Sequence, residues 1–165
     1  MAITSPTESV YNDLLSIIRN SSDVQALVAA GNIHGYETEE QQVLGFHESG
    51  DMPHLEFWPV PGGQRWLRFD CDNAKSDVQF KLRFLTDTER MNGPRGLWAL
   101  DWAIHRAFYQ RIGLIKAGDQ MIDLTLSDFG PLEPWKAERQ DGVRGWCAEL
   151  TIAVQIQMTY SDLTP

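Results

Sequence analysis

The most regular feature of the chain is an alternation of apolar and polar positions close to its C-terminus. Every even-numbered residue from 146 to 160 is apolar: Trp146, Ala148, Leu150, Ile152, Val154, Ile156, Met158 and Tyr160. The odd-numbered positions carry mainly polar or small side chains. Because successive side chains of a strand point to opposite faces of a sheet, this pattern predicts one strand over 145–160 with a single buried face.

The length of this predicted strand suggests a contact with a neighbouring chain. At roughly 3.3 Å per residue it would reach about 50 Å, which is more than a domain of this size needs. We therefore expect the strand either to extend its pairing to another chain or to support one. Its odd-numbered face, with Thr151, Gln155 and Gln157, is neither core-like nor strongly charged, which suits a face half-covered by a partner.

Shorter runs of the same kind predict strands over 33–36, between 54 and 86, and over 121–127. Within 54–86 the pattern separates into strands at 54–60, 64–70 and 78–84, and Pro61-Gly62-Gly63 predicts a hairpin turn between the first two. The stretches 37–53 and 127–145 show no such period, so we expect two long loops there.

Helical spacing predicts N-terminal helices within 6–30 and a further helix over 95–111. Ser5, Pro6 and Glu8 form a helix-start signature, and a second short helix is expected from Ser22, with Gly31 as its terminator. The order α, α, β, β, β, β, α, β, β predicts an α+β fold, a mainly antiparallel sheet with helices on one face. At 165 residues, the chain is expected to form a single domain, 1–165.

The helix over 95–111 has two apolar faces. One broad face predicts the contact with the sheet and comprises Leu97, Leu100, Ala103, Ile104, Ala107 and Phe108. The second face comprises Trp98, Trp102 and Tyr109, with Asp101 and His105 between the two. A contact with another subunit, cover by the 127–145 loop with its own Trp135, and a shelf for a ligand are three alternatives for this second face.

Composition and charge narrow the function classes. The apolar fraction of 42% and the six Trp residues exclude a disordered chain. The net charge of -9 disfavours a site that grips nucleic acid by its phosphates, but it is compatible with DNA that passes by without being held. We expect no signal peptide and no membrane span. Cys71 and Cys147, far apart in the chain, are expected to be reduced thiols.

Three residue groups were considered for catalysis or metal binding. His47, Asp51 and His54, with Glu48 and His34 nearby in sequence, suggest a metal-dependent hydrolase, but their spacing matches no metal motif. The second group is Asp70, Asp72 and Lys81, where a nuclease would need an acid at the position of Gln79. The third is the pair Asp101 and His105, which fits a contact between helix neighbours better than a general base. We expect no catalytic residue, no metal and no cofactor.

The overall arrangement resembles the tail-terminator, or tail-completion, proteins of long-tailed bacteriophages. The resemblance rests on an N-terminal amphipathic helix leading into Asp23-Val-Gln-Ala-Leu-Val-Ala-Ala-Gly-Asn-Ile-His34, and on the strand entry Met52-Pro-His-Leu-Glu-Phe-Trp58. A hairpin, a helix and the long alternating strand follow. The resemblance implies a non-enzymatic virion protein of the tail or neck, assembled in the host cytoplasm. A neck stopper, an adaptor or a tail-tube protein is the alternative.

The same resemblance implies partners, and the residue pattern supplies candidate contact residues for them. Its members form a hexameric ring that ends the tail tube and meets the head connector or stopper protein, while DNA passes through without specific binding. The candidate subunit interface comprises Trp98, Trp102, Tyr109, Thr151, Gln155 and Gln157. The acidic side chains expected to face the tube or the lumen are Glu37, Glu39, Glu40, Glu48 and Asp51.

Overall fold

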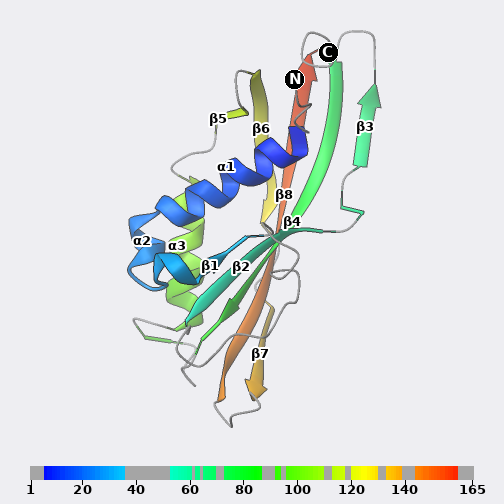
Figure 1. The fold of residues 1–165 in the computed structure, drawn as a ribbon. Helices are drawn as coiled ribbons and strands as arrows, with labels where there is room; N and C mark the ends of the chain where they lie inside the picture. Colours follow the sequence, from blue (N-terminus) through cyan, green and yellow to red (C-terminus); the bar gives the residue numbers. More distant parts are fainter. Residues whose placement is uncertain are drawn as a thin grey trace.

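A computed structural model describes the chain over residues 6–35, 53–60, 62–63, 65–69, 73–86, 92–93, 96–109, 113–117, 120–129, 133–138 and 144–159. Figure 1 shows its helices grouped on one side of a tall, twisted sheet. The sheet contains eight strands, and its main path runs in the order β1-β2-β4-β8-β6-β5.

The helices begin close to where the sequence predicts and end earlier. They are α1 (Pro6–Asn20), α2 (Ser22–Gln25), a 3-10 turn (Ala30–Asn32) and α3 (Leu97–Tyr109). Ser21 caps α2, because its side-chain oxygen accepts a hydrogen bond from the backbone N–H of Val24. The second helix stops at Gln25, short of the predicted limit of 30. Gly31, the predicted terminator, lies inside the 3-10 turn.

The strands are β1 (Ile33–His34), β2 (His54–Pro59), β3 (Arg65–Phe69), β4 (Asn73–Leu85), β5 (Gly113–Ala117), β6 (Gln120–Phe129), β7 (Glu133–Glu138) and β8 (Arg144–Thr159). The short β1 pairs with β2 in parallel, and the other pairings are antiparallel. The α+β prediction with a mainly antiparallel sheet is confirmed.

The two longest strands, β4 and β8, form the middle of the sheet and pair with each other from Asn73↔Thr159 to Leu85↔Cys147. On its other side β8 pairs with β7 over 144–149 and with β6 over 152–157. Both edges of β8 thus pair within the chain, so the alternative in which β8 extends its pairing to a neighbouring chain is wrong. The alternative in which β8 supports a neighbouring chain stays a prediction. The sheet is tall because different short strands flank the lower and upper halves of the β4–β8 pair (Figure 1).

The prediction of a long loop over 127–145 is also wrong. Most of it belongs to strands, since β6 continues to Phe129 and β7 occupies Glu133–Glu138. The strand β7 lacks an apolar alternation and contains Pro134, whose missing N–H is tolerated at the edge of a sheet. A strand β5 was likewise not predicted, and β4 begins at Asn73 rather than near Val78. The buried Ser76 interrupts the apolar series of β4.

The hydrophobic core lies between the helices and one face of the sheet. It takes the even-numbered side chains from Val78 to Phe84 of β4 and from Ala148 to Ile156 of β8, and it takes Leu55 and Phe57 from β2. Phe57 lies between Tyr11 of α1, at 5.3 Å between ring centroids, and Phe80 of β4, at 5.4 Å. The Tyr11 hydroxyl also donates a 3.0 Å hydrogen bond to the backbone oxygen of Phe57. Stacking and hydrogen bonding together fix α1 across the sheet.

Among the described residues, no helix has both the length and the apolar composition needed to cross a membrane.

Candidate functional site

The second apolar face of α3 is uncovered, and we call its three side chains the aromatic edge: Trp98, Trp102 and Tyr109. They are 60%, 65% and 81% exposed. The predicted sheet-facing side of α3 is buried along its whole length. The alternative in which the 127–145 segment covers the edge is wrong, because the backbone of Trp135 instead pairs with Cys147 in β8. The other two alternatives for this edge, a contact with another subunit and a shelf for a ligand, stay predictions.

Helical geometry aligns the aromatic edge in one narrow line. Positions 98, 102 and 109 fall within about 40° of one another at about 100° per residue, and the line is roughly 16 Å long. Two polar contacts border it: His105 Nδ1 lies 3.3 Å from Asp101 Oδ1 and 2.9 Å from the Asp101 backbone oxygen, and Arg106 Nε lies 3.4 Å from Asp23 Oδ2 of α2. The contact predicted between Asp101 and His105 as helix neighbours is therefore present. Burial raises the pKa of Asp101, and the charge of His105 partly offsets the rise.

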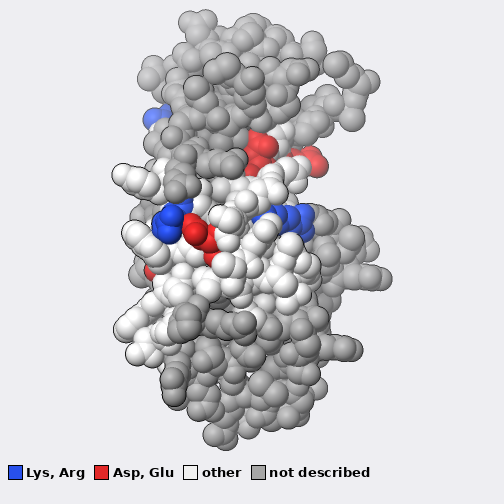
Figure 2. All heavy atoms as spheres, turned by 90° about the vertical axis from the view of Figure 1, so that its left-hand side faces the viewer, with Lys and Arg blue, Asp and Glu red and all other residues white. Residues whose placement is uncertain are grey.

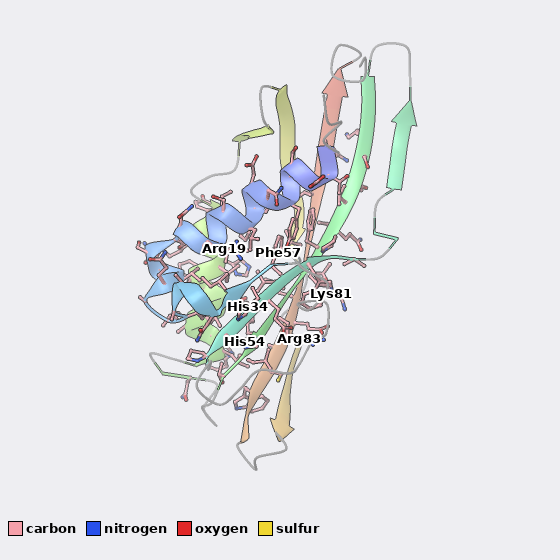
Figure 3. The ribbon with its side chains drawn as sticks, viewed as in Figure 1. Arg19, His34, His54, Phe57, Lys81 and Arg83 are labelled. Carbon is pink, nitrogen blue, oxygen red and sulfur yellow. The ribbon has the colours of Figure 1, made fainter. Side chains whose placement is uncertain are left out.

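The opposite face of the sheet carries a row of charged side chains that the sequence did not reveal. We call Glu56, Lys81, Arg83 and Glu149 the charged row. Cross-strand register places Glu56 of β2 beside Arg83 of β4, and Arg83 beside Glu149 of β8. These residues alternate with core residues along their strands, so they lie on the face that the helices leave free. Figure 3 shows Lys81 and Arg83 as neighbours there.

Within the charged row, each charge has an opposite partner. Arg83 donates from Nη2 to Glu149 Oε1 at 2.6 Å and from Nε to the same oxygen at 3.0 Å. Lys81 Nζ donates to Glu149 Oε2 at 3.0 Å, and Arg83 Nη1 lies 3.7 Å from Glu56 Oε2. The guanidinium carbon of Arg83 also lies 5.2 Å from the ring centroid of Trp58, in cation–π range. The charged row therefore links the three strands β2, β4 and β8 through side-chain hydrogen bonds and ion pairs.

The charged row predicts a pH dependence of stability. Burial by itself would raise the pKa of Glu149, but the hydrogen bonds and charges of Arg83 and Lys81 outweigh it and hold the pKa below its ordinary value. A carboxylate with a lowered pKa in the folded state stabilises the fold above the ordinary Glu pKa of about 4.3, and this contribution is lost as the pH falls through the lowered value. Urea unfolding of the parent and of Glu149→Gln should therefore differ at neutral pH, and the difference should shrink progressively as the pH falls below the ordinary Glu pKa of about 4.3. A difference that stays constant well below that pH, into strongly acidic solution, would contradict the assignment.

The histidines considered for a metal site divide between described and undescribed parts. His34 and His54 lie together, 5.4 Å between ring centroids and nearly perpendicular. His54 is fully buried, and its Nε2 lies 3.1 Å from Glu56 Oε1, so its partner is a carboxylate at the end of the charged row. His47, Glu48 and Asp51 fall outside the described residues. Among those that are described, no group of three or more metal-ligating side chains gathers.

The remaining candidate groups are the nuclease-like set Asp70, Asp72 and Lys81 and the two cysteines. Lys81 bonds Glu149, while Asp70 and Asp72 lie outside the described residues. Cys147 is a free, buried thiol, and burial raises its pKa, partly countered by the charge of Arg83. A raised pKa keeps the thiol protonated and unreactive. Cys71 falls outside the described residues.

The polar face of β8 and the acidic segment were the other predicted contact regions. Thr151 and Gln155 are half-buried on the helix-free face, and Gln155 Nε2 donates a 3.0 Å hydrogen bond to Asp77 Oδ1 of β4. The backbone of Gln157 belongs to β8, and its side chain lies outside what the structure describes. The acidic residues also lie outside the described residues: Glu37, Glu39, Glu40, Glu48 and Asp51.

No protein-family model matches the sequence, and no curated protein matches it. Among solved structures, the fold is similar to a chain from the "Virion of native gene transfer agent (GTA) particle". The TM-score is 0.51 at 9% sequence identity, and the match covers 95% of this chain and 99% of that chain. At this identity the likeness concerns the fold, and it extends over almost the full length of both chains.

Proposed function

We propose that this chain is a structural component of a phage-like virion and that it forms the ring that ends the tail tube. The observation that carries the proposal is the fold match to a virion chain, because it covers 95% of one chain and 99% of the other. A match of that extent relates whole subunits rather than a shared supersecondary motif. It supports a structural virion component. The terminator role is the finer proposal, and it rests on the arrangement of helices and strands described above.

Two further features fit a ring subunit. The aromatic edge leaves three large side chains exposed to solvent, and an exposed apolar patch of this kind typically marks an interaction site. A ring of more than two copies also needs two different contact surfaces on each copy. We assign one of them to the polar β8 face with Thr151 and Gln155, which lies on the other side of the sheet from the helices.

In this proposal the ring lies in the tail or neck of the virion, after assembly in the host cytoplasm. One side of the ring meets the last ring of the tail-tube protein, and the other meets the head connector or stopper protein. The net charge of -9 fits a channel through which DNA slides, since an acidic wall offers phosphates no adhesive sites. We assign contact with the tube or lumen to the acidic residues Glu37, Glu39, Glu40, Glu48 and Asp51.

The test is the mass of the purified chain by native mass spectrometry, alone and after addition of tail tubes from particles that lack it. We expect a closed hexameric ring, either in solution or on the tube end, and no growth beyond one ring. Stacking into long polymers would instead indicate a tail-tube protein. A chain that stays monomeric with tubes present would contradict the ring altogether.

Two variants in the same assay test the assigned surfaces. Thr151→Arg places a long charged side chain on the polar β8 face and is expected to weaken ring formation. Replacing the five acidic side chains with their amides is expected to leave the ring intact and to weaken its hold on the tube. Normal rings from the first variant, or normal capping and tail length from the second, would remove the corresponding assignment.

A further inference from the structure

We propose that the aromatic edge of α3 is the surface through which one copy of this chain binds a second copy. The inference deepens the proposed ring and rests on it, since the ring supplies the second copy. It names Trp98 and Trp102 as the anchors of the contact and Tyr109 as its outer end. Trp and Tyr are the residue types that most often dominate the binding energy of protein interfaces.

The area of the aromatic edge fits a subunit contact. Trp and Tyr side chains each bury about 150–250 Å² when covered, so the exposed fractions of 60%, 65% and 81% leave on the order of 400 Å² of aromatic surface uncovered. A stable interface buries about 800 Å² on each partner. The edge alone would supply about half of that share, which makes it large enough to form the centre of the contact.

The charges around the edge favour a second copy as the occupant. Two copies that each carry a net charge of -9 repel each other unless they meet where the local charge is small. Around the edge, Asp23 is paired with Arg106, and Asp101 is paired with His105. Figure 2 looks onto the side of the molecule on which the helices lie, and the surface described there is largely uncharged, with only scattered acidic and basic groups. An apolar centre with a polar, internally paired border is the usual anatomy of a subunit interface.

The experiment compares two pairs of substitutions placed four residues apart on a helix surface. Trp98→Glu with Trp102→Glu charges the aromatic edge, and Asn12→Glu with Ser16→Glu charges the exposed side of α1 as the matched control. A third protein, Trp98→Gln with Trp102→Gln, removes the aromatic groups without adding charge. The mass of each is measured by native mass spectrometry across concentration, under the conditions in which the parent chain assembles.

We expect both edge variants to weaken self-association by at least about 100-fold, since loss of an aromatic anchor typically costs tenfold or more. The control pair should assemble like the parent. At a concentration at which the parent is monomeric, all variants should keep its thermal midpoint, because the substituted side chains are exposed. Weakened assembly with an unchanged midpoint would support the inference.

The outcomes separate this inference from the proposed ring. If the parent and the edge variants form the same rings, the inference is wrong and the ring stands. If the edge variants still form rings but no longer bind tail tubes, the edge is a tube contact, and the inference is again wrong. If the parent assembles under no condition, both the ring and the inference fail.

Discussion

Replacing Phe80 with alanine is expected to lower the free energy of unfolding by about 3–5 kcal/mol. Phe80 is fully buried in the middle of β4, and its ring contacts those of Phe57 and Tyr11 at 5.4 and 6.1 Å between centroids. Alanine would leave a cavity at the point where α1, β2 and β4 meet. Because small domains are stable by only about 5–15 kcal/mol, a large part of the stability would be lost.

The measurement is urea unfolding of the parent, Phe80→Ala and Gln79→Ala. Gln79 is the exposed neighbour of Phe80 on the same strand, so its replacement changes the strand without opening the core. We expect Gln79→Ala to alter the free energy of unfolding by no more than about 0.5 kcal/mol. A loss below about 1 kcal/mol for Phe80→Ala would mean that the Phe57–Phe80 stack is not a centre of the core.

The core strands were predictable from sequence because their burial follows a strict period of two. Each even residue from Ala148 to Ile156 is apolar and buried, as the alternation requires. The pattern is weaker where strands depart from that rule. In β2 the residues from His54 to Trp58 are buried on both faces, and in β7 the sequence Glu133-Pro-Trp-Lys has no alternation at all. The strand β7 forms by pairing with β8, and its own sequence contains too little apolar alternation to predict a strand.

The aromatic edge was predictable and the charged row was not, for a physical reason. Residues on one helix keep a fixed angular relation, so Trp98 and Trp102 fall on one line whatever the rest of the fold does. Glu56, Arg83 and Glu149 come from three strands far apart in the chain, and only the register of the sheet brings them together. Their one signal was charge at strand-interior positions, which by itself indicates a solvated face equally well.

The second large effect is expected at Arg83. In Arg83→Met, Glu56 loses its guanidinium partner and keeps the contact with His54, at 3.1 Å, while its side chain stays buried at 5% exposed. Glu149 keeps Lys81 alone, at 3.0 Å. Removing one member of a buried ion pair typically costs 3–5 kcal/mol because the other charge stays desolvated. The Arg83 side chain is 22% exposed, so we expect the lower end of that range, about 3 kcal/mol.

A double-mutant cycle in urea tests whether this loss comes from the buried carboxylate of Glu56. Lys81→Met is the matched control, since Lys81 lies on the same strand, bonds the same Glu149 and has a side chain 38% exposed. It should cost no more than about 1 kcal/mol. Adding Glu56→Gln to Arg83→Met removes the buried carboxylate that has lost its guanidinium neighbour, so the double variant should be more stable than additivity predicts by at least about 1 kcal/mol. Additive losses, or equal losses for Lys81→Met and Arg83→Met, would contradict the explanation by the buried Glu56 carboxylate. If the charge is responsible, the difference in free energy of unfolding between the parent and Arg83→Met should also shrink in acid. Protonation of Glu149 then removes the main partner of the guanidinium in the parent.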